Sequence, residues 1–342
     1  MLQIKALVLF SGGLDSILTV KILQKQNIKV IGVCLESVFF SAEKAKIIAN
    51  EINIKLEIIN INQQIVKLIK NPPNGYGKHL NPCIDCHALM IKTVADYFFK
   101  NLKQKYNFDF IATGEVLGQR PFSQNKIALY KVEKLAGIEI LRPLSAKLLD
   151  ETIYEKNKLV KRGMLYDIKG RSREKQIELS KKFKMKNVPS PAGGCILTDS
   201  EFSNRLGKML DYWPKCNSND IELLKNGRIF WFKNKNNNKI LAVIGRNEKD
   251  NNNLKKFARK GDYMIKLKDI TGPITLVRNS NKNLLNSKTI IIPKKLKFSE
   301  LKIINKKNNT EIQKIIELLT GYYSVKARGK KVKLLFNNYY EK

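Results

Sequence analysis

The sequence lacks any stretch that approaches the ~18 consecutive apolar residues of a membrane-spanning helix. Its first residues run directly into a strand pattern, without the basic segment, apolar stretch and cleavage site of a secretory signal. Cysteine is scarce and odd in number, with five among 342 residues, which argues against a disulfide-stabilised scaffold. Together these absences predict a cytoplasmic protein that does not associate with membranes.

Acidic residues are also few, with Asp+Glu 30 against Lys+Arg 64 and a formal net charge of +34. Such a surplus favours binding to a polyanion, and nucleic acid is the leading candidate. Runs rich in Lys and Asn, at residues 234–239 and 251–253, indicate a compositional bias that offers a second explanation for part of the charge.

Residues 1–200 alternate short apolar runs with amphipathic stretches, which predicts an α/β fold with a doubly wound, mostly parallel sheet. In such a sheet, ligands bind at the carboxyl ends of the strands. The expected strands are residues 6–10, 30–35, 55–59 and 108–112, and the expected helices are 14–26, 42–51 and 87–102.

Residues 201–342 have a different pattern, in which strand-like runs are separated by Asn, Lys and Gly turns. This part holds 32 basic and 12 acidic residues, so the shorter part of the chain carries more of the net charge. The pattern predicts a second, smaller α+β domain that binds RNA. Its expected strands are residues 228–232, 240–244, 263–267 and 274–277, followed by a helix at 310–320.

A Ser-Gly-Gly-Leu-Asp-Ser segment at residues 11–16 lies between the first predicted strand and its helix. Such a turn aims backbone N–H groups at one point and adds the helix dipole, which suits a phosphate group. The segment lacks the lysine of the Gly-x-x-x-x-Gly-Lys phosphate-binding loop. The alternative interpretation is a glycine-rich turn with no role in binding or catalysis. Asp15 is a candidate ligand for Mg²⁺.

This segment resembles the pyrophosphate-binding loop of the PP-loop ATP pyrophosphatase superfamily, whose members cleave ATP between the α and β phosphates and transfer AMP. The resemblance extends to Gly114 and Glu115, which end a predicted strand where the superfamily carries a second nucleotide motif; Glu115 stands where histidine is common. It implies the following ATP-binding residues: Phe10, Ser11, Gly12, Gly13, Leu14, Asp15, Ser16, Gly114 and Glu115.

A Cys-x-x-Cys-His string at residues 83–87 and a Gly-Gly-Cys ending at Cys195 supply three thiols, the last of them 109 residues beyond Cys86. Haem attachment, a structural zinc site that includes His87, and persulfide chemistry on a cysteine pair are three interpretations. The interpretation we prefer is a 4Fe–4S cluster on Cys83, Cys86 and Cys195, with one iron left open. Cys34 and Cys216 are expected to be structural or incidental.

The Gly-Gly loop, the cysteine pair and the distant Gly-Gly-Cys segment together resemble the tRNA thiolation enzymes of this superfamily. The resemblance is greatest to the 4-thiouridine synthetase type and next greatest to the 2-thiouridylases. The resemblance implies catalytic roles for Cys83, Cys86, Cys195 and Asp15, and it implies tRNA as substrate. No rhodanese-like domain follows, so sulfur would come from an external donor, as sulfide or from a cysteine desulfurase. A homodimer is compatible with these features.

Arginines near the motifs are candidate RNA contacts, since Arg binds phosphate well. A Gly-Arg-Asn segment at residues 245–247 resembles the RNA-binding domain of the NFACT ribosome-quality-control proteins. The second domain also offers Trp231, Phe232 and Tyr263 as aromatic contacts. The candidate RNA-binding arginines are Arg120, Arg142, Arg171, Arg173 and Arg246.

These parts fit one reaction, in which the enzyme adenylates a uridine carbonyl of tRNA and sulfur then replaces the activated oxygen. Two other functions remain open. One is an adenylating ligase or amidotransferase of the same superfamily acting on a small molecule. The other is a non-catalytic RNA-binding factor that uses ATP as a switch.

Overall fold

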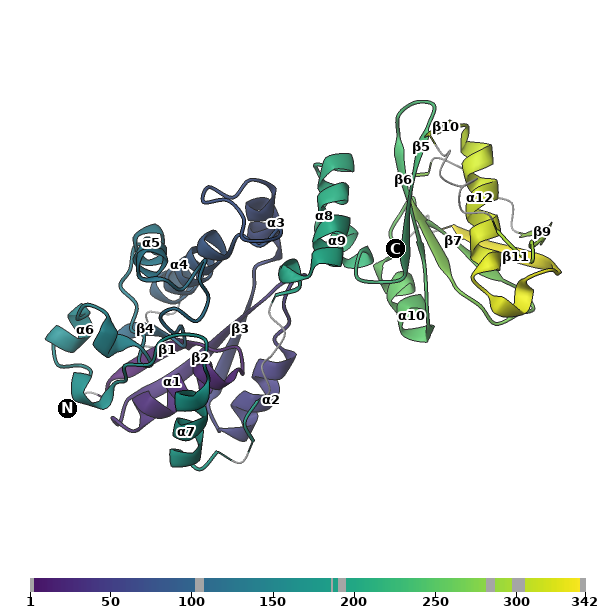
Figure 1. Cartoon of the computed structure of the whole chain (residues 1–342). Helices are drawn as coiled ribbons and strands as arrows, with labels where there is room; N and C mark the ends of the chain where they lie inside the picture. The colour runs from purple at the N-terminus through teal and green to yellow at the C-terminus, as the bar shows by residue number, and fades with distance from the viewer. Residues whose placement is uncertain are drawn as a thin grey trace. The chain divides into compact units, whose positions relative to one another are not determined.

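The computed structural model describes residues 3–101, 108–185, 187–189, 195–280, 287–296 and 305–338. The chain divides into two compact units, Met1–Ser203 and Asn204–Lys342, each with its own sheet (Figure 1). No described helix has the length and apolarity that crossing a membrane requires.

Four parallel strands form the sheet of the first unit, in the order β3-β2-β1-β4. All four strands run the same way because helices connect them, and this confirms the predicted α/β fold. The strands are β1 (Lys5–Leu9), β2 (Lys29–Glu36), β3 (Lys55–Asn60) and β4 (Phe110–Thr113).

Helices cover both faces of this sheet, which is why the strands read as nearly continuous apolar runs (Figure 1). On β1, Ala6 and Val8 pack in one cluster with α1 and α2, while Leu9 packs in another with α4 and α5. The helices of this unit are α1 (Leu14–Gln24), α2 (Glu43–Glu51), α3 (Asn62–Lys70), α4 (Cys83–Asn101), α5 (Lys126–Ala136), α6 (Ile153–Lys156) and α7 (Glu174–Lys182).

The chain order reverses at β1, because β2 and β3 lie on one side of it and β4 lies on the other. Leu9, the last residue of β1, is paired with Val33 of β2 and with Thr113 of β4. The segments that follow β1 and β4 therefore leave the sheet side by side. Ligand sites in open α/β sheets form at such a reversal.

A seven-stranded sheet in the order β10-β5-β6-β8-β7-β11-β9 makes up the second unit, antiparallel except for the β10–β5 pair. Helix α12 (Asn309–Tyr322) lays Ile312, Ile316 and Leu319 on this sheet, which gives the unit its core. This confirms the predicted α+β unit. Its other elements are α8 (Ser200–Tyr212, which starts before the division), α9 (Ser218–Leu223), β5 (Arg228–Asn234), β6 (Lys239–Ile244), α10 (Glu248–Phe257), β7 (Tyr263–Leu267), β8 (Thr275–Arg278), β9 (Ser287–Ile291), β10 (Asn305–Lys307) and β11 (Lys331–Asn338).

Candidate active site

The turn between β1 and α1 holds its shape through glycine and through serine hydroxyls. Gly12 has φ of 70°, and a Cβ there would lie 2.9 Å from the carbonyl oxygen of Lys44, so only glycine fits. The Ser16 hydroxyl donates to the Gly13 carbonyl at 2.8 Å. No side chain caps the first turn of α1, which leaves its N–H groups without a side-chain acceptor. This is the arrangement that an anion completes.

Asp15 on this turn has one carboxylate oxygen engaged and one unpaired. Its Oδ2 accepts a hydrogen bond of 3.1 Å from Nε2 of Gln119, whereas its Oδ1 is buried without a hydrogen-bond partner. A buried, unpaired carboxylate oxygen costs free energy unless a cation or donor satisfies it. Because carboxylates are preferred Mg²⁺ ligands, the orphaned Oδ1 fits a magnesium ion that accompanies a phosphate.

The phosphate-loop cavity, about 410 Å³, opens between this turn and the end of β4. Its polar walls include Asp15, Gln119 and Arg120. Gly114 lies so close to α1 that a Cβ there would be 2.7 Å from the carbonyl carbon of Asp15. The two predicted nucleotide motifs therefore form one surface. The predicted residues that line this cavity are Ser11, Gly13, Leu14, Asp15, Ser16, Gly114 and Glu115, whereas Gly12 packs behind it.

A second cavity, the thiol cavity of about 580 Å³, is lined by Cys83, Cys86 and Cys195. The structure therefore brings together three thiols that are far apart in the sequence. Cys34 on β2 lines the same cavity, as does Phe10, whose side chain otherwise belongs to the core. All five cysteines of the chain are free.

The start of α4 fixes Cys83 and Cys86. The Asn81 side-chain amide donates to Sγ of Cys83 at 3.2 Å, and the Cys86 N–H donates to the Pro82 carbonyl at 2.8 Å. The carboxylate of Asp85 accepts from the backbone N–H of Asn74 at 2.9 Å, which ties the preceding loop to the helix. The N–H···S contact is of the kind that supports a ligating thiolate.

Cys195 reaches the cavity because its turn is held on the loop after β2. The N–H of Ile196 donates to the Phe39 carbonyl at 3.3 Å, and the Thr198 hydroxyl donates to the Cys195 carbonyl at 2.8 Å. The predicted Gly193 and Gly194 that precede this cysteine lie outside the described residues.

Cys86 is buried, Cys83 and Cys195 are partly buried, and the three thiols lie close enough to influence one another. Burial, and then the nearby Cys195 and Cys83, raise the pKa of Cys86. Burial raises the pKa of Cys195 to about 11, with Cys83 adding to the rise. Iron or another thiophilic cation would offset this cost, because it stabilises the thiolate form.

Within the described residues, no group of three or more His, Cys, Asp or Glu side chains is placed to hold a single metal ion. The single-zinc interpretation with His87 therefore has no site there, and His87 contacts Glu115 instead. A four-iron cluster differs, since each iron takes its own thiolate and the sulfurs need not converge on one point. Three thiols around one cavity fit such a cluster.

The two cavities share a wall. Residues that line both come from β1, the phosphate loop, α4 and the segment after β4. A molecule bound at the phosphate loop is therefore adjacent to one bound beside the thiols. The shared residues are Leu9, Ser11, Gly13, His87, Met90 and Arg120.

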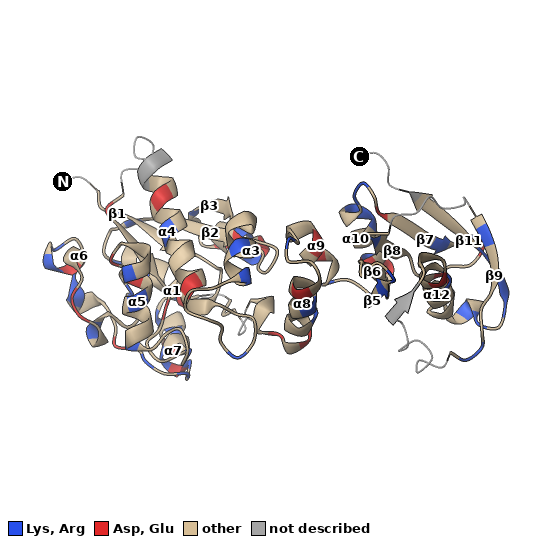
Figure 2. Ribbon diagram, turned by 90° about the horizontal axis from the view of Figure 1, so that it is seen from above, with Lys and Arg blue, Asp and Glu red and all other residues tan. Residues whose placement is uncertain are grey.

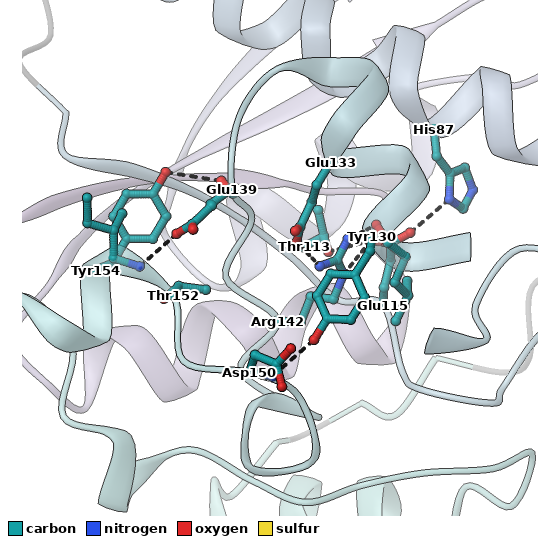
Figure 3. Close-up of polar contacts among 12 residues, drawn as sticks. His87, Thr113, Glu115, Tyr130, Glu133, Glu139, Arg142, Asp150, Thr152 and Tyr154 are labelled. Carbon is teal, nitrogen blue, oxygen red and sulfur yellow. Dashed lines mark hydrogen bonds and ion pairs between the residues drawn. The ribbon is translucent and has the colours of Figure 1, made fainter. Parts of the chain in front are cut away.

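A chain of charged groups runs from His87 in this wall to buried side chains in the interior, drawn in Figure 3. His87 Nδ1 lies 2.8 Å from Glu115 Oε1, and Arg142 Nε donates to Glu115 Oε2 at 3.0 Å. Arg142 also pairs with Glu133. Although burial alone would raise it, the positive charge of Arg142 and the hydrogen bond from His87 lower the pKa of Glu115 to about 2. Glu115 is therefore a carboxylate that fixes neighbouring side chains.

The expectation that Arg142 contacts RNA is wrong. Its side chain is 1% exposed and is enclosed by Glu115 and Glu133, so it has no surface to offer. Phe232 and Tyr263, expected as aromatic RNA contacts, are 1% and 2% exposed and belong to the core of the second unit. Successive side chains of a strand point to opposite faces of the sheet, and these two rings lie on the face that is buried in the core.

The other predicted arginines lie at or near the surface. Arg120 is exposed and lines both cavities, and Arg173 lines the phosphate-loop cavity while donating to the Pro189 carbonyl at 3.1 Å. Arg171 is exposed beside α7. Arg246, in the second unit, donates through Nε to Asp250 at 2.7 Å. Figure 2 shows Lys and Arg spread over both units, including α5, α7 and α10.

Three residues that line the cavities were not among the predicted site residues. Cys34 was expected to be structural or incidental, yet it lies near the carboxyl end of β2 and lines the thiol cavity. Gln119 bonds Asp15, and Gln124 has a buried Oε1 with no partner at the phosphate-loop cavity. For the two glutamines, nearness to the Gly114 motif was the only available signal.

Residues 4–135 match the family model of the tRNA methyl transferase HUP domain. This match agrees with the α/β fold of the first unit.

The curated relatives are thiouridylases. The chain is 25% identical over 244 residues to the tRNA-specific 2-thiouridylase MnmA of Karelsulcia muelleri (strain GWSS), covering 68% of this chain and 60% of the relative. It is 31% identical over 118 residues to tRNA-specific 2-thiouridylase MnmA 2 of Fusobacterium nucleatum subsp. nucleatum, covering 32% and 33%. The chain thus spans less than two thirds of either relative.

Solved structures show weaker likeness. A predicted subunit of tRNA methyltransferase from Methanocaldococcus jannaschii aligns with TM-score 0.32 and 21% identity, covering 46% of this chain and 73% of that one. The U34-tRNA thiolase NcsA from Methanococcus maripaludis, solved with its [4Fe-4S] cluster, aligns with TM-score 0.30 and 16% identity, covering 62% and 67%. A 4-thiouridine synthetase–RNA complex with bound ATP aligns with TM-score 0.34 and 20% identity, covering 53% and 51%.

Proposed function

We propose that this protein is an ATP-dependent tRNA sulfurtransferase, which adenylates a uridine carbonyl oxygen and replaces that oxygen with sulfur. One observation carries the proposal: the cavity lined by Cys83, Cys86 and Cys195 shares a wall with the cavity at the phosphate loop. A nucleotide-activating site and a sulfur-handling site thus adjoin each other. The similarity to curated thiouridylases supports the same substrate class.

Adenylation is assigned to the phosphate-loop cavity. The uridine oxygen attacks the α phosphate, the O–P bond forms, the bond to the β phosphate breaks and pyrophosphate leaves. The uncapped first turn of α1 holds the departing pyrophosphate, and Asp15, whose Oδ1 is unpaired, would hold an accompanying Mg²⁺, which would neutralise phosphate charge. Arg120, which faces both cavities, stabilises charge that develops on the α phosphate.

Sulfur transfer is assigned to the thiol cavity. Hydrosulfide attacks the activated ring carbon, a C–S bond forms, the C–O bond breaks and AMP leaves. Cys83, Cys86 and Cys195 would hold a 4Fe–4S cluster, which supplies an iron with an open coordination position for sulfur. Asn81 orients Cys83 by its N–H···S contact, and the largely apolar walls keep water from competing for the activated carbon.

The partners follow from this chemistry. The substrate is tRNA, drawn by the +34 net charge, and sulfur arrives as sulfide or from a cysteine desulfurase. We place tRNA contacts at Arg120, Arg171 and Arg173 in the first unit and at Arg246 in the second, which we propose to be an RNA-binding domain of NFACT type. A cytoplasmic location and a homodimer belong to the same proposal.

A deletion strain tests the proposal. Mass spectrometry of total tRNA nucleosides should show loss of one thiouridine and its return with the wild-type gene. Complementation by Asp15→Asn and Cys195→Ser should fail, while complementation by Cys216→Ser, a thiol buried in the second unit, should succeed. Unchanged thiouridine in the deletion strain would overturn the proposal, and full rescue by Asp15→Asn would favour a non-catalytic RNA-binding role.

A further inference from the structure

The second unit contains a cavity that the proposed reaction does not use. This Trp213 pocket, of about 580 Å³, lies where three loops meet at one end of the seven-stranded sheet. The loops are the α8–α9 connection, which carries Trp213 and Lys215, the α10–β7 connection, which carries Arg259 and Lys260, and the end of β8 at Arg278. Its volume lies in the range of small-ligand sites.

A buried ion network makes the floor of the pocket rigid. Arg278 is 2% exposed and donates to Asp220 at 2.8 Å and to Asp262 at 2.7 Å. It also donates to the Phe257 carbonyl at 2.8 Å. Arg278 thus neutralises the two carboxylates, and Arg259 adds a second cation to Asp220 at 2.9 Å. A floor held by this many charge-assisted bonds does not need to rearrange when a ligand binds.

The rim is cationic and one wall is aromatic. Lys215, Arg259 and Lys260 are exposed at the mouth, so cations outnumber carboxylates in the lining. The Trp213 indole is held in orientation by a hydrogen bond of 3.2 Å to the Lys239 carbonyl and by edge contact with Trp231 at 4.8 Å between ring centroids. A fixed indole next to exposed cations is the combination that binds a base and its phosphate together.

We propose that the Trp213 pocket binds an unpaired nucleotide of the RNA substrate. The base lies against Trp213, and the phosphate lies at the rim between Lys215, Arg259 and Lys260. Double-stranded RNA does not fit a pocket of this size, so the site selects a single-stranded end, loop or bulge. The inference rests on the proposed function for the identity of the macromolecule as RNA.

Tryptophan fluorescence of the full chain tests the pocket, since both tryptophans of the protein, Trp213 and Trp231, lie in the second unit. Titration with UMP should quench this fluorescence, whereas uridine and inorganic phosphate should bind at least about tenfold more weakly, because each lacks one of the two contacts. The double variant Lys215→Glu/Lys260→Glu should weaken UMP binding by about tenfold or more. The control double variant Lys235→Glu/Lys249→Glu makes an equal charge change in the same unit, at residues that do not line the pocket. Its affinity for UMP should stay within about twofold of the wild type.

Binding of a single-stranded oligouridylate gives the second measurement. The Lys215→Glu/Lys260→Glu variant should lower the salt dependence by about two contacts, which the matched control should not do. Equal UMP affinity in both double variants, or phosphate binding as tight as UMP binding, would overturn the pocket proposal. If the wild type binds UMP as expected but forms no thiouridine, the pocket stands and the proposed function fails. If thiouridine forms but UMP does not quench the fluorescence, the proposed function stands and the pocket proposal fails.

Discussion

The imidazole Nδ1 of His87 lies 2.8 Å from carboxylate Oε1 of Glu115. This contact joins α4, which begins with the cysteine pair, to the segment after β4 beside the phosphate loop. Glu115 also accepts from Arg142, so three side chains from distant parts of the chain hold one another in place. The position of the thiols and the position of the nucleotide motif are thereby linked.

Replacing Glu115 by Gln should destabilise the protein at neutral pH. Burial opposes the charge, but Arg142 and His87 lower the pKa of Glu115 from 4.5 to about 2. A lowered pKa in the folded state contributes stability above pH 4.5, and this contribution disappears as the pH falls from 4.5 toward 2. The shift corresponds to roughly 3 kcal/mol of unfolding free energy at pH 7.

Urea unfolding of both proteins at several pH values measures this contribution. The difference between wild type and Glu115→Gln should be large at pH 7 and should shrink on acidification below pH 4.5. Glu178→Gln, in an exposed ion pair with Lys182, should change stability by less than about 0.5 kcal/mol. A difference that does not vary with pH would contradict the assignment.

Gly114→Ala should impair nucleotide binding and stability together. The added Cβ would lie 2.7 Å from the Asp15 carbonyl carbon and 2.8 Å from the Ser16 backbone nitrogen, so the first turn of α1 must move. We expect a loss of about 1–3 kcal/mol in stability and about tenfold or more in ATP affinity, by calorimetry. Gly163→Ala, where a Cβ meets nothing within 4 Å, is the matched control. Equal behaviour of the two variants would show that the motifs do not touch as described.

Asp15→Asn should weaken binding of ATP with Mg²⁺ far more than binding of ATP without it. The amide keeps the shape of the side chain, and with it the contact to Gln119, but removes the charge that the buried Oδ1 offers to a cation. A fall of about tenfold or more is expected only when Mg²⁺ is present. Asp167→Asn, at a side chain 59% exposed, should leave both affinities unchanged. A Mg²⁺-independent loss would move Asp15 to a different role.

The strands, the phosphate loop and the cysteines could be predicted because each leaves a local pattern in the sequence. Apolar runs mark β1, β2 and β4, and a glycine pair marks the turn after β1. Arg142 could not be placed, because a buried arginine and a surface arginine look alike until Glu115 and Glu133 are brought to it by the fold.

The second unit illustrates the same limit. Phe232 and Tyr263 were expected at an RNA surface, since aromatic residues beside basic ones also suit that use. Their strands pair within the sheet in a register that puts both rings in the core with α12. The sequence did not reveal this register. Cys34 was expected to be structural or incidental for a related reason: its neighbours at the cavity come from α4 and from residues near Cys195.

Single cysteine-to-serine changes should separate the three cavity thiols from the other two. After anaerobic reconstitution, Cys83→Ser, Cys86→Ser and Cys195→Ser should each lose most bound iron and its visible absorbance, because a cluster needs all three thiolates. Cys34→Ser and Cys216→Ser should keep iron near the wild-type level. If the wild type binds no iron and Cys83 forms a disulfide with Cys195 during turnover, cysteine persulfide chemistry replaces the cluster.

The most direct test of the proposed function is a single-turnover reaction of the reconstituted protein with unmodified tRNA, Mg²⁺-ATP and sulfide under anaerobic conditions, with nucleosides and nucleotides quantified together. We predict one thiouridine formed for each AMP and each pyrophosphate released, and no product when the Asp15→Asn variant is used. AMP release without thiouridine, or release of ADP in place of AMP, would contradict the proposed function.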